Sequence, residues 1–166
     1  MTLSIRKAAE DDAAAIIQLH FDAVHVTAAA DYEQDILNDW SRPLAGRLEA
    51  MQEQLKVNVE QTEMFVCELA DEIVGFGELA PRTNEIRAVY VAPSTSRKGV
   101  GKKLLQELEK SAIGHGLTEL WLDSSLTAVP FYSSQGFVGS VESEHTLRSG
   151  KKMRCLKMQK TISSLL

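Results

Sequence analysis

Cysteine is scarce in this sequence, and long apolar runs are missing from it. The 166 residues include two cysteines, Cys67 and Cys155, too few for a disulfide framework or a metal cluster. Each lies in an apolar, strand-like segment, so we expect both to be packing residues in a reducing cytoplasm. No apolar run approaches the roughly 20 residues of a membrane span, and residues 1–12 lack the apolar centre of a signal peptide. The sequence predicts a cytoplasmic protein without a membrane partner.

Positive charge is also in short supply. The chain has 18 lysines and arginines against 23 acidic residues, which gives a formal net charge of −5. Because nucleic-acid binding requires a basic surface, this balance argues against a nucleic-acid partner. His20 and His25 are five residues apart, a spacing that does not place two metal ligands on one helical face. We therefore expect no metal site.

The composition is that of a globular domain. Hydrophobic residues make up 44% of the chain and charged residues 25%, and 166 residues are enough to bury one core. The hydrophobic periodicities predict the order βααα-βββ-α-β-α-ββ. The expected strands are 2–8, 63–70, 72–80, 85–93, 117–123, 137–143 and 151–160, and the expected helices are 10–29, 31–41, 44–58, 98–115 and 126–135. We expect residues 2–160 to form a single α/β (α+β) domain with a mostly antiparallel sheet.

The stretch SRKGVGKKLL, residues 96–105, gathers four cations around two glycines at the start of an expected helix. Positive charge and free N–H groups at a helix N-terminus favour an anion. A P-loop does not fit, because it requires an earlier Gly and a Ser or Thr after the Gly-Lys pair. A Rossmann turn does not fit either, because Leu104 stands where its third Gly is needed. A plain turn and a pyrophosphate-binding loop remain as alternatives.

A second segment, SSLTAVPFYSSQGF at 124–137, contains a Phe-Tyr pair followed by a Gly-Phe pair. With the loop and the order of elements, it resembles the GNAT superfamily, the acetyl-CoA-dependent N-acetyltransferases. The family's loop reads Gln/Arg-x-x-Gly-x-Gly/Ala and stands here as SRKGVG, with Ser96 in the first place. Many members have an Asn seven residues before the Tyr, where Ser125 stands. The resemblance covers nearly the whole chain. It implies a GNAT-like fold, a mixed sheet of about seven strands with helices on both faces.

The resemblance also implies acetyl-CoA as co-substrate. The strand before the loop would splay from its neighbour and offer its backbone to the pantetheine arm, while the loop N–H groups surround the pyrophosphate. Lys102 or Lys103 would reach the 3′-phosphate, although a solvated helix face explains each lysine equally well. The implied cofactor-binding residues are Val89, Tyr90, Val91, Arg97, Lys98, Gly99, Val100, Gly101, Lys102 and Ser125.

Acetyl transfer to an amine requires a donor to the carbonyl oxygen and an acid for the thiolate. The backbone N–H of Val91 in the splayed strand is the expected donor. Tyr132 matches the family's Tyr and is the implied acid, since a phenol can donate a proton to sulfur at neutral pH. The alternative for Tyr132 is a packing role beside Phe131 and Phe137.

The transfer also requires a base for the amine. Glu85 begins its strand and, by the period of two, shares a face with Val89 and Val91. Histone-acetyltransferase-like members carry a Glu at the same distance before the first loop glycine. We therefore expect Glu85 to be the base, with Glu78 on the neighbouring strand or a water molecule as alternatives.

The acceptor is expected to be a primary amine of a small molecule or a peptide. Segment 31–41 carries Asp31, Glu33, Asp35 and Asp39. This acidic rim would attract a cationic amine such as a polyamine, an aminoglycoside or a lysine side chain, unless it is simply a solvated helix. The fold is also compatible with a homodimer. A coenzyme A-binding sensor or partner-binding module without catalysis is the second class of function, disfavoured by the presence of both a Glu and a Tyr at the catalytic positions.

Overall fold

The computed structural model of the protein describes residues 2–57 and 61–163. The strands are β1 (Leu3–Lys7), β2 (Glu63–Leu69), β3 (Glu72–Ala80), β4 (Glu85–Val91), β5 (Glu119–Ser125), β6 (Val138–Thr146) and β7 (Lys152–Thr161). The helices are α1 (Ala13–Asp22), α2 (Gln34–Trp40), α3 (Leu48–Val57), α4 (Val100–Gly114) and α5 (Val129–Ser134). These elements follow one another in the order predicted from the sequence.

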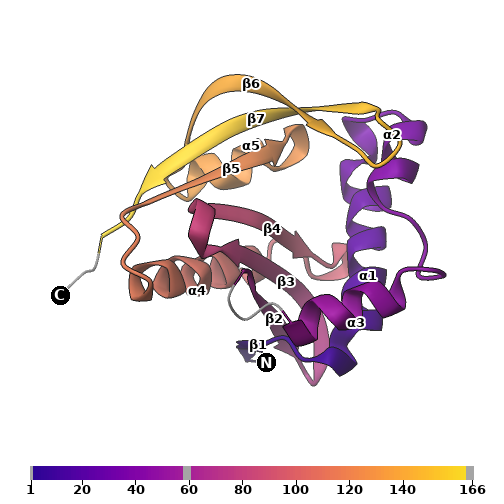
Figure 1. Ribbon diagram of the computed structural model, residues 1–166, viewed down its shortest axis with the longest axis horizontal. Helices are drawn as coiled ribbons and strands as arrows, with labels where there is room; N and C mark the ends of the chain where they lie inside the picture. Colours follow the sequence, from indigo (N-terminus) through magenta and orange to yellow (C-terminus); the bar gives the residue numbers. More distant parts are fainter. Residues whose placement is uncertain (1, 58–60, 164–166) are drawn as a thin grey trace.

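In the part of the chain that the structure describes, seven strands form one sheet in the order β1-β2-β3-β4-β5-β7-β6 (Figure 1). Neighbouring strands are antiparallel except β4 and β5, which run parallel. The link between β2 and β3 is the expected tight turn, in which Ala70 and Asp71 adopt left-handed angles, φ 51° and 65°. The predicted mixed, mostly antiparallel sheet is confirmed.

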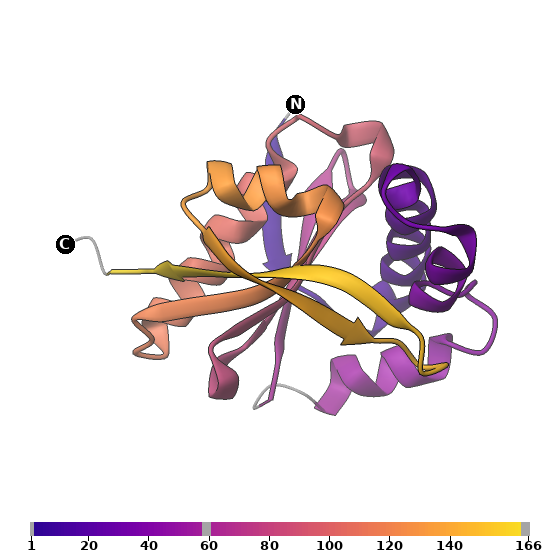
Figure 2. The same cartoon turned by 90° about the horizontal axis from the view of Figure 1, so that it is seen from above.

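Strands β4 and β5 diverge along their length. Their register consists of one residue pair, Glu85 with Trp121. A hydrogen bond from the N–H of Trp121 to the carbonyl of Asn84, at 3.0 Å, lies beside this pair. Figure 2 shows β5 to β7 crossing β2 to β4 at a large angle. The predicted splay of the strand before the loop is confirmed, and it leaves the rest of the β4 edge open.

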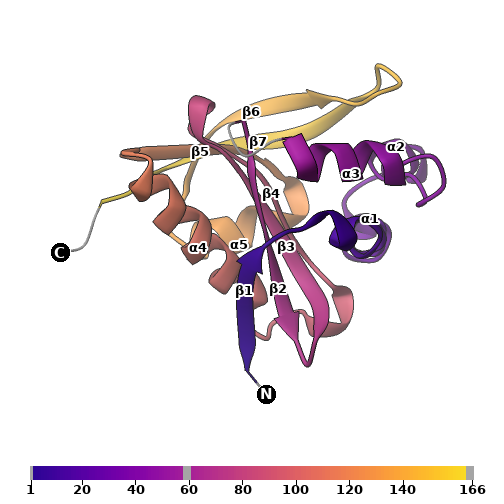
Figure 3. The same cartoon turned by 60° about the horizontal axis from the view of Figure 1, so that its bottom comes forward.

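Helices cover both faces of β2 to β4, as the resemblance implies (Figure 3). On one face, Ile16 and Leu19 of α1 pack against Val66 and Phe76. On the other face, Leu104 of α4 is part of the main core. Burial of a side chain of this kind contributes about 1.5–3 kcal/mol, so packing on both faces stabilises the position of β4 in the sheet.

Most elements differ from their predicted bounds by a few residues, and three of these differences have a structural explanation. Helix α3 begins at Leu48, four residues later than expected, because residues 44–47 form a turn in which Gly46 has φ 81°. Strand β6 continues to Thr146 because it stays paired with β7 up to Thr146 and Lys152. Helix α1 ends at Asp22, and the chain continues as a π-helical turn over Ala23–Thr27.

One stretch corrects an expectation about apolar runs. Residues Glu10–Ala30 are long and apolar enough to cross a membrane by length and composition alone. Core helices of soluble proteins meet the same criterion. Here Ile16, Ile17 and Val24 of this stretch are buried against the rest of the fold, and Asp12 at its start is bound by the guanidinium of Arg6 at 2.7 Å. In this fold the stretch is a core layer.

Candidate active site

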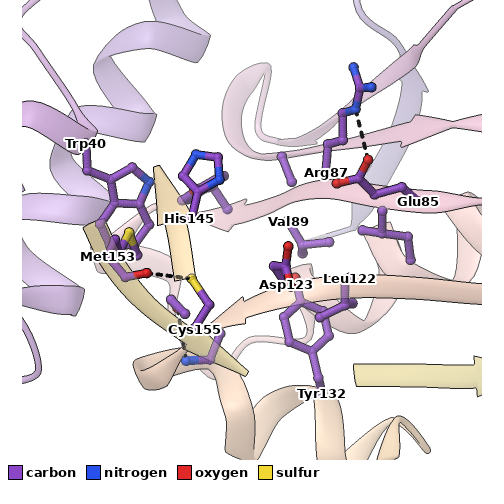
Figure 4. Close-up of a pocket in the computed structure, with 15 residues that line it drawn as sticks. Trp40, Glu85, Arg87, Val89, Leu122, Asp123, Tyr132, His145, Met153 and Cys155 are labelled. Atoms are coloured by element: carbon purple, nitrogen blue, oxygen red, sulfur yellow. Dashed lines mark hydrogen bonds and ion pairs between the residues drawn. The ribbon is translucent and has the colours of Figure 1, made fainter. Parts of the chain in front are cut away.

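Two cavities lie at the opening between β4 and β5. The loop cavity, about 430 Å³, lies beside residues 96–99 and the first turn of α4. The sheet cavity, about 370 Å³, lies between the β4 edge and strands β5 and β7 (Figure 4). Both are lined by Trp40, Val89, Tyr90, Ser125 and Ala128. The two cavities therefore adjoin each other along the open edge of β4.

The loop cavity brings together nine of the ten residues expected to bind the cofactor. Lys98 is the exception, since it is outside the lining. Ser96, which stands where the family's loop has Gln or Arg, also lines this cavity, as does Phe131. The expected residues that line it are Val89, Tyr90, Val91, Arg97, Gly99, Val100, Gly101, Lys102 and Ser125.

The loop before α4 has the backbone shape of an anion site. Arg97 and Gly99 both adopt left-handed angles, φ 63° and 82°. Gly99 then caps α4, whose first-turn residues Val100, Gly101 and Lys102 line the loop cavity. The N–H groups of a first helical turn have no partner within the helix and carry partial positive charge. This end of the cavity is therefore suited to a phosphate or diphosphate.

The two loop glycines are needed for different reasons. Gly99 has open space around it, and its left-handed backbone is what favours glycine. Gly101 has ordinary helical geometry, but a Cβ built there would lie 3.1 Å from the ring of Phe131. The close approach is between α4 and α5, so the protein's own packing accounts for this glycine without a ligand.

Two of the implied cofactor contacts compete with contacts inside the protein. The ammonium group of Lys103 donates to the carbonyl of Leu3 at 2.6 Å, so it fastens β1 to α4. The hydroxyl of Ser125 accepts from the N–H of Ala128 at 3.3 Å and caps the short turn before α5. Of the two candidate lysines, Lys102 is the one that faces the loop cavity.

The open edge of β4 presents backbone groups to the cavities. The N–H of Ala92 donates to the carbonyl of Val74 on β3 at 2.8 Å. Successive N–H groups of a strand point to opposite edges, so those of Val91 and Val89 point away from β3, toward the opening. The geometry agrees with the role that the sequence suggested for the N–H of Val91.

Tyr132 lies at the wall of the sheet cavity. Its side chain packs between Phe131 and Phe137, with ring centroids 5.1 Å and 5.7 Å away, and the residue is 6% exposed. Burial raises the pKa of Tyr132 well above its usual range, so the phenol stays protonated at neutral pH. The packing of the ring is thus observed, and the place of Tyr132 at the cavity wall leaves its role as an acid open as a prediction.

Glu85 also lines the sheet cavity, but the reason given for its orientation was wrong. A bulge at Arg87 breaks the alternation of β4, since Glu78 pairs with Ala88 while Leu79 pairs with Ile86. As a result Ile86, not Glu85, shares the core-facing side with Val89 and Val91.

The bulge leaves the carboxylate of Glu85 at one end of the sheet cavity. There the guanidinium of Arg87 donates to it at 3.4 Å (Figure 4). Trp40 and Met153 lie at the other end of this cavity, with Tyr132 and Leu122 between the two ends. Glu85 of β4 and Tyr132 of α5 therefore line the same space.

Glu78, the alternative base, faces a third and smaller space. This helix cavity, about 180 Å³, lies under α1 and α3 and is lined by His20, Arg47, Gln54, Glu78, Arg87 and Tyr90, among others. The carboxyl group of Glu78 accepts from the amide of Gln54 at 3.0 Å, and burial raises its pKa. Glu78 is outside the lining of the sheet cavity, so the structure separates it from Tyr132.

Three of the four acidic residues of segment 31–41 are already engaged within the protein. Asp35 binds the ammonium group of Lys151 at 3.1 Å, and Asp39 binds Arg42 at 3.1 Å and the N–H of Ser149 at 3.2 Å. Asp31 accepts from the hydroxyl of Thr127 at 2.7 Å. These carboxylates join α2 to the β6–β7 turn and to the segment before α5.

Several residues of the sheet cavity were missed by the sequence analysis. Asp123 and Cys155 face this space from β5 and β7, and His145 faces it from β6. Cys67 and Cys155 are buried and unpaired, as expected, and burial raises the pKa of Cys155 to about 11. Asp123 ends the expected strand 117–123 beside the segment that carries the Tyr, which was an available signal. Within residues 2–57 and 61–163, no three His, Cys, Asp or Glu side chains are placed to hold a metal ion.

Known proteins are similar to this chain in sequence and in fold. Residues 28–162 match the family described as the acetyltransferase (GNAT) domain. The chain is 27% identical over 143 residues to a spermidine N(1)-acetyltransferase of Thermoplasma acidophilum, a match that covers 82% of this chain and 89% of that protein.

Solved structures agree with the family match. A GCN5-related N-acetyltransferase from Rhodopseudomonas palustris is similar with a TM-score of 0.85 and 23% identity, over 98% of this chain and 97% of that one. PaiA N-acetyltransferase from Thermoplasma acidophilum, solved in complex with coenzyme A, has a TM-score of 0.77 and 22% identity, over 97% and 99% of the two chains. Because the family match spans most of the chain, the protein belongs to the GNAT acetyltransferases, the acetyl-CoA-dependent enzymes that its loop and Phe-Tyr segment resemble.

Proposed function

We propose that the protein transfers the acetyl group of acetyl-CoA directly to a primary amine of a small molecule or peptide. The observation that carries this proposal is that the loop cavity at the N-terminus of α4 adjoins the sheet cavity, which is lined by Glu85 and Tyr132. A module that only bound coenzyme A would have no use for the sheet cavity.

The loop cavity provides the binding half. The first-turn N–H groups of α4, with Arg97 and Lys102, would hold the diphosphate. The outward-facing backbone of Val89 and Val91 would pair with the amides of the pantetheine arm, as a strand adds to a sheet edge. Acetyl-CoA supplies a thioester whose acetyl carbon is open to attack by an amine.

The sheet cavity provides the catalytic half. The carboxylate of Glu85, directly or through water, takes the proton that the amine loses as the C–N bond forms. The N–H of Val91 donates to the carbonyl oxygen while negative charge develops there. Tyr132 gives its proton to the sulfur as the C–S bond breaks, and Arg87 keeps Glu85 oriented. Direct transfer fits the site because neither cysteine is a suitable nucleophile, since burial raises the pKa of both thiols.

The acceptor class is a primary amine. The T. acidophilum relative is named for spermidine, which agrees with an amine acceptor without naming the one used here. The two buried, unpaired cysteines suit a reducing cytoplasm.

Two experiments test this proposal, first of acetyl-CoA binding and then of turnover. Acetyl-CoA should raise the melting temperature in proportion to the logarithm of its concentration, with ATP and NAD as controls. A panel of primary amines with acetyl-CoA should then release free thiol and give N-acetylated products by mass spectrometry. Stabilisation by ATP or NAD but not by acetyl-CoA at millimolar concentration would contradict the assignment of the loop cavity.

A further inference from the structure

The helix cavity has no part in the mechanism above, yet it adjoins the catalytic space. It shares Arg87, Ala88 and Tyr90 with the sheet cavity, so the two spaces meet where β4 bulges. A molecule whose amine lies beside Glu85 could extend past Ala88 and Tyr90 and place its other end under α1 and α3. The helix cavity has a volume of about 180 Å³, which admits a small group rather than a peptide chain.

Arg47 is the distinctive group in this cavity. Its guanidinium donates to the carbonyl of Arg42 at 2.6 Å and to the hydroxyl of Ser41 at 3.4 Å, both uncharged oxygens. Among residues 2–57 and 61–163, no carboxylate lies within ion-pair distance of it. Burial and the nearby charges of Arg148 and Arg42 lower the pKa of Arg47, which reflects a positive charge in a site without a counter-ion.

The other polar groups of the cavity do not neutralise Arg47. His20 is uncharged at neutral pH, because burial lowers its pKa to about 3. Arg87 is already paired with Glu85, and burial raises the pKa of Glu78, which disfavours its ionised form. Burial also raises the pKa of Tyr90 to about 12, so its phenol is neutral. None of these groups forms an ion pair with Arg47, so among the described residues its guanidinium is the group of this cavity that is left to bind an anion.

We propose that the helix cavity binds a carboxylate carried by the acceptor, with Arg47 as its principal partner, so that the substrate is an amino acid or a related amine with an anionic end. The proposal rests on the proposed function, because it places the reacting amine in the sheet cavity. Glu85 and Asp123 at one end of the substrate and Arg47 at the other match the two charges of such a molecule. A guanidinium binds a carboxylate through two parallel hydrogen bonds, and a polyamine would instead bring a second cation toward Arg47.

Matched acceptor series test the proposal. Glycine, β-alanine, 4-aminobutyrate, 5-aminopentanoate and 6-aminohexanoate are compared with the n-alkylamines of the same chain length, together with L-lysine against cadaverine and spermidine. At the best length, kcat/KM for the carboxylate-bearing acceptor should exceed that of its alkylamine by about tenfold or more, which corresponds to one charge-assisted contact. The optimal length reports the distance between the two subsites.

Variants assign the preference to Arg47. Arg47→Gln should bring the ratio between the matched acceptors close to one, mainly through KM for the amino acid, and Arg47→Lys should keep part of it. Arg154→Gln is the control, because it removes the same charge from a side chain that is 69% exposed and paired with an exposed Glu142. The melting temperature and the KM for acetyl-CoA should match the parent in all three variants.

The outcomes separate the two proposals. If wild-type protein uses alkylamines or spermidine as well as amino acids at every chain length, the carboxylate subsite is wrong while the acetyltransferase stands. A preference for amino acids that survives in Arg47→Gln would also overturn the role of Arg47. If acetyl-CoA neither stabilises the protein nor is consumed with any amine, the proposed function is wrong, and the carboxylate subsite that rests on it is wrong too. Should Arg47→Gln not fold, the wild-type series and Arg47→Lys still decide.

Discussion

Gly101 lies directly against Phe131, so that a Cβ at position 101 would be 3.1 Å from two carbons of the ring. The contact joins the first turn of α4 to α5, and both residues line the loop cavity. Glycine is therefore favoured at position 101 by the packing of two helices, whereas at position 99 it is favoured by the left-handed backbone angle.

This difference gives the first prediction. Gly101→Ala should incur a packing loss of about 1–3 kcal/mol, because its methyl group is forced against the Phe131 ring, and this loss offsets the roughly 1 kcal/mol that Ala gains over Gly inside a helix. Replacing Phe131 by Leu as well should recover part of that loss, since the smaller side chain makes room. Gly99→Ala should also destabilise, by about 1–2 kcal/mol through its left-handed backbone, but Phe131→Leu should bring no recovery there. Denaturant unfolding of the two double-mutant cycles measures this coupling.

The second prediction concerns two neighbouring lysines. Lys102 faces the loop cavity, while Lys103 holds the carbonyl of Leu3. Lys102→Ala should weaken acetyl-CoA binding by about tenfold at low salt, and by less at high salt because the contact is ionic. Lys103→Ala should lower the melting temperature and leave the affinity close to that of the parent. Calorimetric titration at two salt concentrations checks both, and equal effects of the two variants would contradict the orientation of α4.

The third prediction concerns Tyr132. Tyr132→Phe should lower kcat by roughly a hundredfold, within the range of a general acid, and leave acetyl-CoA affinity nearly unchanged. The ring remains, so the packing with Phe131 and Phe137 should persist and the melting temperature should change little. Because burial raises the pKa of Tyr132, loss of its proton should not set the alkaline limb of the pH–rate profile below pH 10. Equal rates in variant and parent would assign Tyr132 to packing alone.

The fourth prediction concerns the base. Glu85→Gln should lower kcat/KM and remove the acidic limb of the pH–rate profile, because the amide cannot take a proton from the amine. Steady-state rates between pH 5 and 9 check this. An unchanged profile would move the role to water, since Glu78 faces a different cavity from Tyr132.

The fold could be predicted from the sequence because its signals are local. Alternating strands, amphipathic helices and the Gly-x-Gly loop each depend on residues close in the chain, and the family resemblance ordered them. The bulge at Arg87 could not be predicted, because it depends on how β4 meets β3 across the Glu78–Leu79 step. Because of this one extra residue, Ile86 and not Glu85 shares a face with Val89.

The site was predicted only in part for a similar reason. Most residues expected to bind the cofactor lie in one stretch, 89–102, so they were found together, and Ser125 was added from the segment that carries the Tyr. The helix cavity, which we propose as part of the acceptor site, is built from α1, α3, β2, β3 and β4, and Arg47 enters it from a loop with no motif. The ion pairs of Asp35 with Lys151 and of Asp39 with Arg42 could not be predicted from segment 31–41, because these partners lie close only in the folded chain.

The last prediction concerns the stability of the protein and Glu78. Its carboxyl group has an ordinary pKa of 4.5, which burial raises in the folded state. The native state then binds this proton more tightly than the unfolded state does. The resulting stabilisation is fully present below pH 4.5 and is lost as the pH rises through the higher folded pKa. At neutral pH the ionised form opposes folding. Glu78→Gln removes that charge and keeps an oxygen that can accept from Gln54.

The free energy of unfolding of Glu78→Gln should therefore exceed that of the parent at pH 7, and the difference should shrink as the pH falls toward 4. Urea unfolding across this range measures it. Glu85→Gln is the matched control, because Glu85 is paired with Arg87, so the same change should destabilise slightly at pH 7 instead. A Glu78→Gln protein that is less stable than the parent at pH 7 would show that Glu78 is held as a stabilising carboxylate. The helix cavity would then be less positive than Arg47 and Arg87 alone make it.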